Sequence, residues 1–195
     1  MTGIKYERVM GVKTLARTGW MLRGIHPQVA ETVASHTFET AFITMLIVDE
    51  VRKAGLKLDG LKALEIALLH DIPESVEGDI VKWSKDRLEE VVKLEESALK
   101  ELGLEIYSWI VEELDELSTP EAVIVKIADN LATALQAARY VRIGYGGASE
   151  ILDSCLKAAR KLARTRLSGD LSAIVGAVVE DLAKNCYPRS SDACG

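Results

Sequence analysis

The chain has 195 residues, of which 48% are hydrophobic and 28% are charged, and its net charge is −6. This composition is typical of a folded globular domain and excludes a disordered chain. The acidic balance, without any block of lysine and arginine residues, argues against long-range attraction to a nucleic acid polymer.

The sequence offers no segment suited to a membrane or to secretion. The longest apolar run, residues 41–48, is interrupted by Thr44, whereas a membrane span needs about 20 apolar residues. Lys5, Glu7 and Arg8 interrupt any apolar stretch near the N-terminus, so no signal peptide is predicted. We therefore expect a cytoplasmic protein that does not enter a membrane. The three cysteines are too few and too scattered for a disulfide framework.

Apolar residues recur at intervals of three and four along most of the chain, which is the helical period. In chain order, the predicted helices are residues 29–54, 61–70, 85–102, 104–117, 120–142, 148–167 and 170–185. Gly55 and Gly103 are expected to end the first and third of these helices. Thr119 and Pro120 form a clear start for the fifth, since threonine caps helices and proline suits the first helical position. We predict a compact, single-domain, all-α fold of about seven to nine helices over residues 1–187, followed by a frayed tail over residues 188–195.

Polar side chains interrupt the apolar faces of these helices. His36 shares a face with Val33 and Thr40, and His70 and Asp71 end a helix that is apolar nearly all round and therefore expected to be buried. A buried carboxylate needs a cation, hydrogen-bond donors or an exit to water. Two simpler readings stay open here: a core histidine with a satisfied hydrogen bond, and a helix end that frays and exposes Asp71.

Asp129 lies in the middle of the predicted helix 120–142, in an apolar stretch. Alone, it could form a buried salt bridge or cap a neighbouring helix. Together, however, His36, His70, Asp71 and Asp129 provide two imidazoles and two carboxylates from separate helices, a mixed nitrogen and oxygen set for a divalent ion. Four such ligands leave one or two positions for water or phosphate, which would let the ion act as a Lewis acid.

The order H…HD…D of these residues resembles the signature of the HD superfamily of metal-dependent phosphohydrolases, and the flanking residues resemble its 5′-deoxynucleotidase group. Residues 31–36 read E-T-V-A-S-H, similar to the group's E-S-V-A-E-H, and residues 69–79 match its L-H-D-x-x-E-x-x-x-G-D. Residues 127–130 (I-A-D-N) resemble its A-A-D block, and residues 17–20 match R-x-G-W. Ser35 departs from the pattern, because the group carries an acidic residue before the histidine, so we expect weaker support of the histidine ring here.

The resemblance implies that His36, His70, Asp71 and Asp129 bind the metal, and that Glu74 and Asp79 act as acid/base groups beside it. The sequence is compatible with this assignment, because Gly78 permits a tight turn that could direct Asp79 back toward the site. The alternative for both acidic residues is ordinary surface charge. We adopt that alternative for the neighbouring Glu77.

Arg17 is the candidate phosphate ligand, since a guanidinium group matches the oxygens of a phosphate. The alternative is a solvated side chain. Trp20 could line the sugar or base pocket, and the resemblance associates this tryptophan with a preference for deoxyribose. The alternative for Trp20 is packing in the core. Arg23 is a weaker second cation. His26, beside a proline in a loop, is interpreted as a surface residue.

These residues predict a metal-dependent phosphomonoesterase that hydrolyses (deoxy)nucleoside 5′-monophosphates to nucleoside and phosphate. Co²⁺ or Mn²⁺ is the expected ion, and Zn²⁺, Fe²⁺ and Mg²⁺ also suit the ligands. A different phosphoester, such as a cyclic nucleotide or a nucleotide polyphosphate, is the first alternative, and a non-catalytic nucleotide-binding helical module is the second. The resemblance also implies a homodimer.

Overall fold

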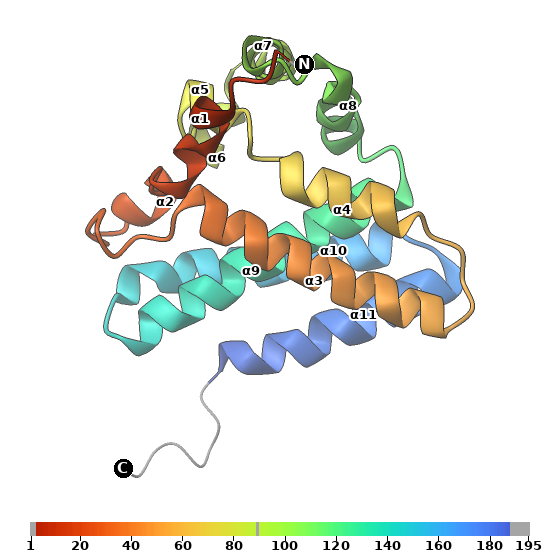
Figure 1. The fold of residues 1–195 in the computed structure, drawn as a ribbon. Coiled ribbons are helices and arrows are strands. Elements are labelled where there is room, and N and C mark those ends of the chain that lie inside the picture. The colour runs from red at the N-terminus through yellow and green to blue at the C-terminus, as the bar shows by residue number, and fades with distance from the viewer. Residues whose placement is uncertain (1–2, 89, 188–195) are drawn as a thin grey trace.

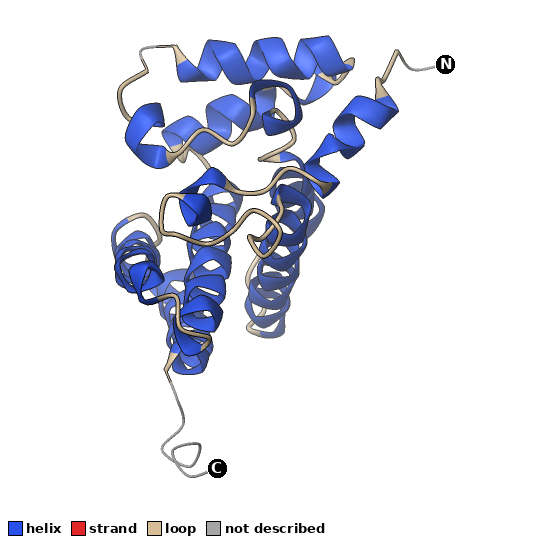
Figure 2. Cartoon of the chain, turned by 90° about the vertical axis from the view of Figure 1, so that its left-hand side faces the viewer, coloured by secondary structure: helices blue, strands red, loops and turns tan. Residues whose placement is uncertain are grey.

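The computed structural model describes residues 3–88 and 90–187, and these residues form helices and connecting loops (Figures 1 and 2). Their one β-type pairing is an isolated bridge between Ala16 and Thr32. The α-helices are α1 (Tyr6–Val9), α2 (Thr18–Met21), α3 (Val33–Lys53), α4 (Gly60–Leu69), α5 (Glu74–Glu77), α6 (Lys82–Lys85), α7 (Val91–Leu102), α8 (Trp109–Glu116), α9 (Pro120–Arg142), α10 (Ser149–Thr165) and α11 (Gly169–Ala183). Short 3₁₀ helices are η1 (Met10–Lys13), η2 (Glu105–Tyr107), η3 (Gly146–Ala148) and η4 (Lys184–Cys186). The predicted all-α fold class is confirmed.

The long helices form one bundle, in which α3 and α9 contact each other along their lengths (Figure 1). Helix α4 packs against both of them, α10 packs against α9, and α11 packs against α10 and α3. A smaller group, containing α1, α5 and α7, packs together at one end of this bundle (Figure 1). Because α9 touches α3, α4 and α10, a polar side chain on its buried faces meets several helices at once.

Helix α9 has the bounds that its capping residues predict. Oγ1 of Thr119 accepts a hydrogen bond from the N–H of Ala122 at 3.3 Å, and Pro120 occupies the first turn. Small residues such as Ala128 and Ala132 are fully buried along this helix, and small side chains allow close approach of neighbouring helices.

Helix α3 begins four residues later than predicted. Thr32 is its cap, with Oγ1 accepting a hydrogen bond from the N–H of Ser35 at 3.2 Å. Val29, expected on the buried helix face, lies before the helix and is 49% exposed. The end of α3 agrees with the prediction, because Gly55 adopts a left-handed φ of 75°, which glycine adopts without strain.

Two other expectations are wrong. The predicted helix 85–102 begins only at Val91, as α7, whereas Lys85 ends the short helix α6, and Nζ of Lys85 donates to Oε1 of Glu95 on α7 at 2.9 Å. Helix α4 is not buried all round, since Leu61 is 70% exposed and Leu68 is 51% exposed. The predicted frayed tail, residues 188–195, lies outside the described residues.

Over residues 3–88 and 90–187, no helix combines the length and the apolar character that a bilayer span requires.

Candidate metal centre and active site

His36 projects from the first half of α3 into the protein interior and is fully buried. Its Nε2 atom lies 3.1 Å from Oδ1 of Asp129 and 3.4 Å from Oγ1 of Thr40, one turn along the same helix. Within the described part of the chain, its Nδ1 atom is buried without a hydrogen-bond partner. His36 therefore directs one ring nitrogen toward a carboxylate of α9.

His70 caps the C-terminal end of α4, and Asp71 follows it in the turn. Nδ1 of His70 lies 2.8 Å from the carbonyl oxygen of Ala67, which can only accept, so Nδ1 carries the proton. In the neutral ring the other nitrogen, Nε2, then has a lone pair. This Nε2 lies 3.2 Å from Oδ2 of Asp71 but makes no hydrogen bond to any described residue. A ring held in this tautomer by a backbone carbonyl is the usual arrangement of a metal-binding histidine.

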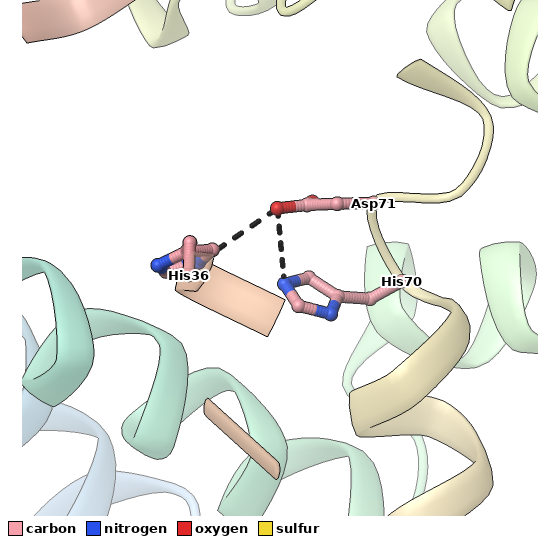
Figure 3. A group of neighbouring side chains, drawn as sticks. All are labelled: His36, His70 and Asp71. Atoms are coloured by element: carbon pink, nitrogen blue, oxygen red, sulfur yellow. Dashed lines mark ion pairs between the residues drawn. The ribbon is translucent and has the colours of Figure 1, made fainter. Parts of the chain in front are cut away.

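The three side chains converge on one point (Figure 3). One Asp71 oxygen, Oδ2, lies 3.2 Å from Nε2 of His70 and 3.7 Å from Nε2 of His36. The two imidazole rings are 5.6 Å apart between centroids. The ligand-type atoms of His36, His70 and Asp71 all lie within 4.8 Å of one another.

Asp129 joins this cluster from α9 through its contact with His36, and only 15% of its side chain is exposed. Its other oxygen, Oδ2, lies 2.7 Å from Nζ of Lys126, one turn earlier on the same helix. Lys126 was not among the residues predicted from the sequence. Its spacing of three residues from Asp129, which places both side chains on one helix face, is the signal that could have identified it.

The donor atoms fit a divalent cation. Two ligand atoms that are each about 2.1 Å from an ion and subtend about 90–110° lie about 3.0–3.4 Å apart. Two of the observed distances, 3.1 and 3.2 Å, fall within this range, and the third, 3.7 Å, lies slightly above it. The buried Nε2 of His70 also lacks a hydrogen-bond donor in the described residues, so a cation would satisfy it. HD-type use of a divalent ion is therefore compatible with the residues present.

The electrostatic field of the cluster keeps its carboxylates ionised. Burial tends to raise the pKa of Asp71, but in the metal-free protein the charge and hydrogen bond of a protonated His70, together with the charges of His36 and Arg17, outweigh it, and the pKa is lowered. Burial also opposes ionisation of Asp129, but Lys126 and His36 hold its pKa well below the ordinary value. Both side chains therefore offer charged oxygens at neutral pH.

Glu74 lies in the first turn of α5, just after Asp71, and is only 4% exposed. Its Oε1 atom is 3.8 Å from Nζ of Lys85, and its Oε2 atom is buried without a partner among the described residues. Burial, together with the charges of Asp71 and Asp79, raises the pKa of Glu74 to about 10. This side chain is not the ordinary surface charge of the simpler reading.

Asp79 is held by the start of α2. Its Oδ2 atom accepts a hydrogen bond from the N–H of Thr18, and its carbonyl oxygen accepts one from Oγ1 of Thr18 at 2.9 Å. Asp79 therefore ties the loop after α5 to the segment that carries Arg17, and one of its oxygens is already engaged.

Arg17 lies immediately before α2, with 19% of its side chain exposed. Its Nη1 atom donates to Oγ1 of Thr133 at 3.3 Å and lies 3.7 Å from Oε2 of Glu31. Burial lowers the pKa of Arg17, but the charges of Asp71, Glu31 and other carboxylates raise it more. Arg17 thus lies within the field of the His/Asp cluster as a permanent cation.

Trp20 is only 2% exposed and packs edge-on against Tyr140, with ring centroids 5.1 Å apart. Its indole N–H donates to Oε2 of Glu31 at 3.1 Å. This burial favours the core-packing alternative and leaves Trp20 no open face toward a ligand in this structure. Sequence reasoning missed Glu31 as an individual residue, although it begins the E-T-V-A-S-H segment.

Arg23, His26 and Glu77 differ in their exposure to solvent. Arg23 pairs with Glu150 at 3.0 Å at the surface, and His26 is exposed, as expected. The interpretation of Glu77 as surface charge is wrong, because both of its carboxylate oxygens are buried without a partner in the described residues. The helix turn α5, which includes Glu77, packs against α7.

The all-helical fold and its buried His/Asp cluster match the class of metal-dependent phosphohydrolases that the sequence predicted. The family model of the HD domain matches residues 9–164, and the chain belongs to the HD domain family. It is 32% identical over 149 residues to the 5′-deoxynucleotidase HDDC2 of Dictyostelium discoideum, covering 70% of this chain and 76% of that protein. It is also 32% identical over 147 residues to the 5′-deoxynucleotidase HDDC2 of Homo sapiens, covering 70% of this chain and 67% of that protein.

Two solved structures from Pyrococcus species share this fold. A conserved hypothetical protein from Pyrococcus furiosus superposes with a TM-score of 0.78 at 31% identity, covering 92% of this chain and 97% of that chain. The PH0347 protein from Pyrococcus horikoshii gives the same TM-score at 30% identity, covering 93% of this chain and 98% of that chain.

Proposed function

We propose that this protein hydrolyses nucleoside 5′-monophosphates, with deoxynucleotides preferred, to nucleoside and inorganic phosphate. The observation that carries the proposal is the convergence of His36, His70, Asp71 and Asp129, with the buried Glu74 beside them. The similarity to the 5′-deoxynucleotidases HDDC2 of Dictyostelium discoideum and Homo sapiens supports the substrate class.

In this proposal His36, His70, Asp71 and Asp129 hold one divalent ion. When bound, the ion supplies a Lewis acid for a phosphoryl oxygen and lowers the pKa of a water molecule. The hydrogen bond from Nδ1 of His70 to the Ala67 carbonyl keeps Nε2 available as a ligand. The proximity of Lys126 keeps Asp129 ionised.

The chain must also place the phosphate and move a proton. In the reaction the oxygen of water bonds to phosphorus, the bond from phosphorus to the 5′-oxygen breaks, and that oxygen takes up a proton. Arg17 would bind the phosphate oxygens, because its guanidinium is charged at every relevant pH and is partly open to solvent. Glu74 would orient the attacking water or protonate the 5′-oxygen through Oε2, which has no partner among the described residues. Asp79 is the weaker candidate for this step, since Thr18 already occupies its Oδ2.

The experiment is a metal-exchange assay on a panel of ribo- and deoxynucleotides, with cyclic nucleotides and nucleoside triphosphates included. We expect phosphate release from deoxynucleoside 5′-monophosphates that stops on chelation and returns when Co²⁺ or Mn²⁺ is added. Hydrolysis that is indifferent to chelation would contradict the metal site. Turnover confined to cyclic nucleotides or triphosphates would contradict the substrate class.

We also propose Co²⁺ or Mn²⁺ as the ion, a homodimer in solution and a location in the cytoplasm. The mixed imidazole and carboxylate ligands support the choice of metal. Exposed apolar residues on α3, where Phe38 and Phe42 stack with 72% and 47% of their surface exposed, are compatible with a subunit contact. Light scattering that gives the mass of one chain would contradict the dimer.

A further inference from the structure

We infer that Glu31 is a positioning residue that holds Arg17 in its phosphate-binding place. This inference rests on the proposed function, because it assigns Arg17 to the phosphate. Glu31 lies just before α3 and is 8% exposed, with 4% of its side chain accessible. No sequence motif identified it as a separate functional residue.

The carboxylate of Glu31 connects the two residues of the R-x-G-W segment. Its Oε2 atom accepts the indole N–H of Trp20 at 3.1 Å and lies 3.7 Å from Nη1 of Arg17. Trp20 is fixed by core packing against Tyr140. The carboxylate is therefore held on one side by a rigid buried ring, and it presents its charge to Arg17 on the other.

The backbone of Glu31 is fixed as firmly as its side chain. Its N–H donates to the hydroxyl of Tyr140 at 2.7 Å, and this hydroxyl donates in turn to the carbonyl of Val29 at 3.1 Å. The carbonyl of Glu31 accepts the N–H of Arg17 at 2.9 Å. Glu31 and Arg17 are thus paired through both main chain and side chain, which leaves Glu31 little freedom to move away.

The charge of Glu31 is the part that core packing does not explain. A neutral side-chain oxygen would accept the indole N–H of Trp20 equally well, whereas a buried carboxylate carries a desolvation cost. Consistent with that cost, burial raises the pKa of Glu31, although His36 and Arg17 oppose the shift. An ionised Glu31 gives Arg17 a counter-charge at 3.7 Å, which a neutral oxygen at this position could not provide.

Arg17 has competing partners close by. The carboxylates whose charges act on it are Asp71, Glu31, Asp129 and Asp79. Of these, Asp71 and Asp129 are proposed metal ligands, and Asp79 is engaged by Thr18. Glu31 is the carboxylate that can attract Arg17 without drawing it onto the metal ligands. Its function is then to keep the guanidinium beside the centre, where it can bind a phosphate and does not displace the ion.

The test compares wild type, Glu31→Gln, Arg17→Ala and the double variant, all loaded with Mn²⁺ and assayed with a deoxynucleoside 5′-monophosphate. Glu31→Gln keeps an oxygen for Trp20 and removes the charge. We expect KM to rise about tenfold in Glu31→Gln, because Arg17 loses its counter-charge, with kcat changed less than about threefold. On the Arg17→Ala background the same substitution should change KM by less than about twofold, because Glu31 acts through Arg17.

Glu180→Gln is the matched control. It removes a carboxylate on α11 that accepts two hydrogen bonds from Arg160, of 2.9 and 2.8 Å, and neither residue belongs to the proposed centre. It should leave KM unchanged. An equal rise of KM in Glu31→Gln with and without Arg17, or no rise at all, would overturn the inference.

Two further measurements keep the outcomes distinct. If wild type releases no phosphate, the proposed function fails. The role of Glu31 is then tested by calorimetric binding of inorganic phosphate to wild type and to Glu31→Gln. Weaker binding in Glu31→Gln supports the inference, and equal binding overturns it. If Glu31→Gln does not fold, Glu31→Asp keeps the charge but shortens its reach. A higher KM in that variant supports the inference, and a lower kcat at unchanged KM contradicts it.

Discussion

Nζ of Lys126 lies 2.7 Å from Oδ2 of Asp129, while Oδ1 of the same carboxylate lies 3.1 Å from Nε2 of His36. One carboxylate therefore connects a helix-surface cation with the buried His/Asp cluster. Lys126 lies one turn from Asp129 on α9, and 44% of its side chain is exposed. It neutralises the outer oxygen and leaves the inner oxygen for the centre.

This arrangement predicts the behaviour of Lys126→Met. Without the ammonium group, Asp129 and Asp71 lie in one buried cluster with less positive charge nearby, so the metal-free protein should melt at a lower temperature. Each kcal/mol lost corresponds to roughly 2–4 °C for a chain of this size. Added Mn²⁺ should then raise the melting temperature more than it does in wild type. Calorimetric scans with chelator and with Mn²⁺ measure both effects, and an unchanged metal-dependent rise would contradict the prediction.

Glu74→Gln should separate catalysis from metal binding. Glu74 is not among the proposed ligands, so the variant should retain the metal content of wild type, while kcat falls about 10²–10⁴-fold because the proton-transferring group is lost. Elemental analysis and steady-state kinetics give the two values. Asp71→Ala is the contrasting variant. It removes a proposed ligand, so it should lose both metal and activity. It should also be less stable, since binding of the ion contributes to folding stability. Loss of metal in Glu74→Gln would make Glu74 a ligand.

Glu77 predicts a pH dependence of stability in the chelated protein. Burial and the charge of Glu95 raise its pKa from 4.5 to about 7, against the opposing effect of Lys85. Between these values the folded state keeps a proton that the unfolded state has lost, so this group's contribution to stability falls as pH rises from about 4.5 to about 7.

Glu77→Gln removes this titration. We expect the variant to match wild type near pH 4.5 and to exceed it in unfolding free energy at pH 8, as measured by urea denaturation. A variant that is less stable than wild type at pH 8 would show that the ionised carboxylate is stabilised by its surroundings.

Gly103 ends α7 with a left-handed φ of 73°, and a Cβ atom at this position would lie against the backbone carbonyl of Gly3. Gly55 has a similar φ of 75° but no heavy atom within 4 Å of the same added atom. Gly55→Ala should therefore cost about 1–2 kcal/mol from the backbone conformation alone. Gly103→Ala should cost more, because the N-terminal segment must also move. If urea denaturation gives the same loss of unfolding free energy for both variants, the N-terminal segment moves aside at no measurable cost.

The contrast between α9 and the segment 82–102 shows why some elements were predictable. The start of α9 depends on Thr119 and Pro120, whose effects act within one helical turn. Residues 85–90 have no such local signal, and the break between α6 and α7 accompanies the contact of Lys85 with Glu95. A contact that forms only in the folded chain cannot be read from local propensity.

For the candidate centre, the sequence alone determined which polar residues stand on apolar helix faces, because the helical period assigns each residue to a face. It thereby singled out His36, Asp129 and the His70–Asp71 pair, and the structure brings these four together. Only the tertiary structure decided which side chains meet across the bundle, such as Glu31 with Trp20. The physical reason is that the helical period gives only the side of the helix on which a side chain lies. Hydrogen bonds and ion pairs between distant segments depend on how the helices pack, to within a few ångströms.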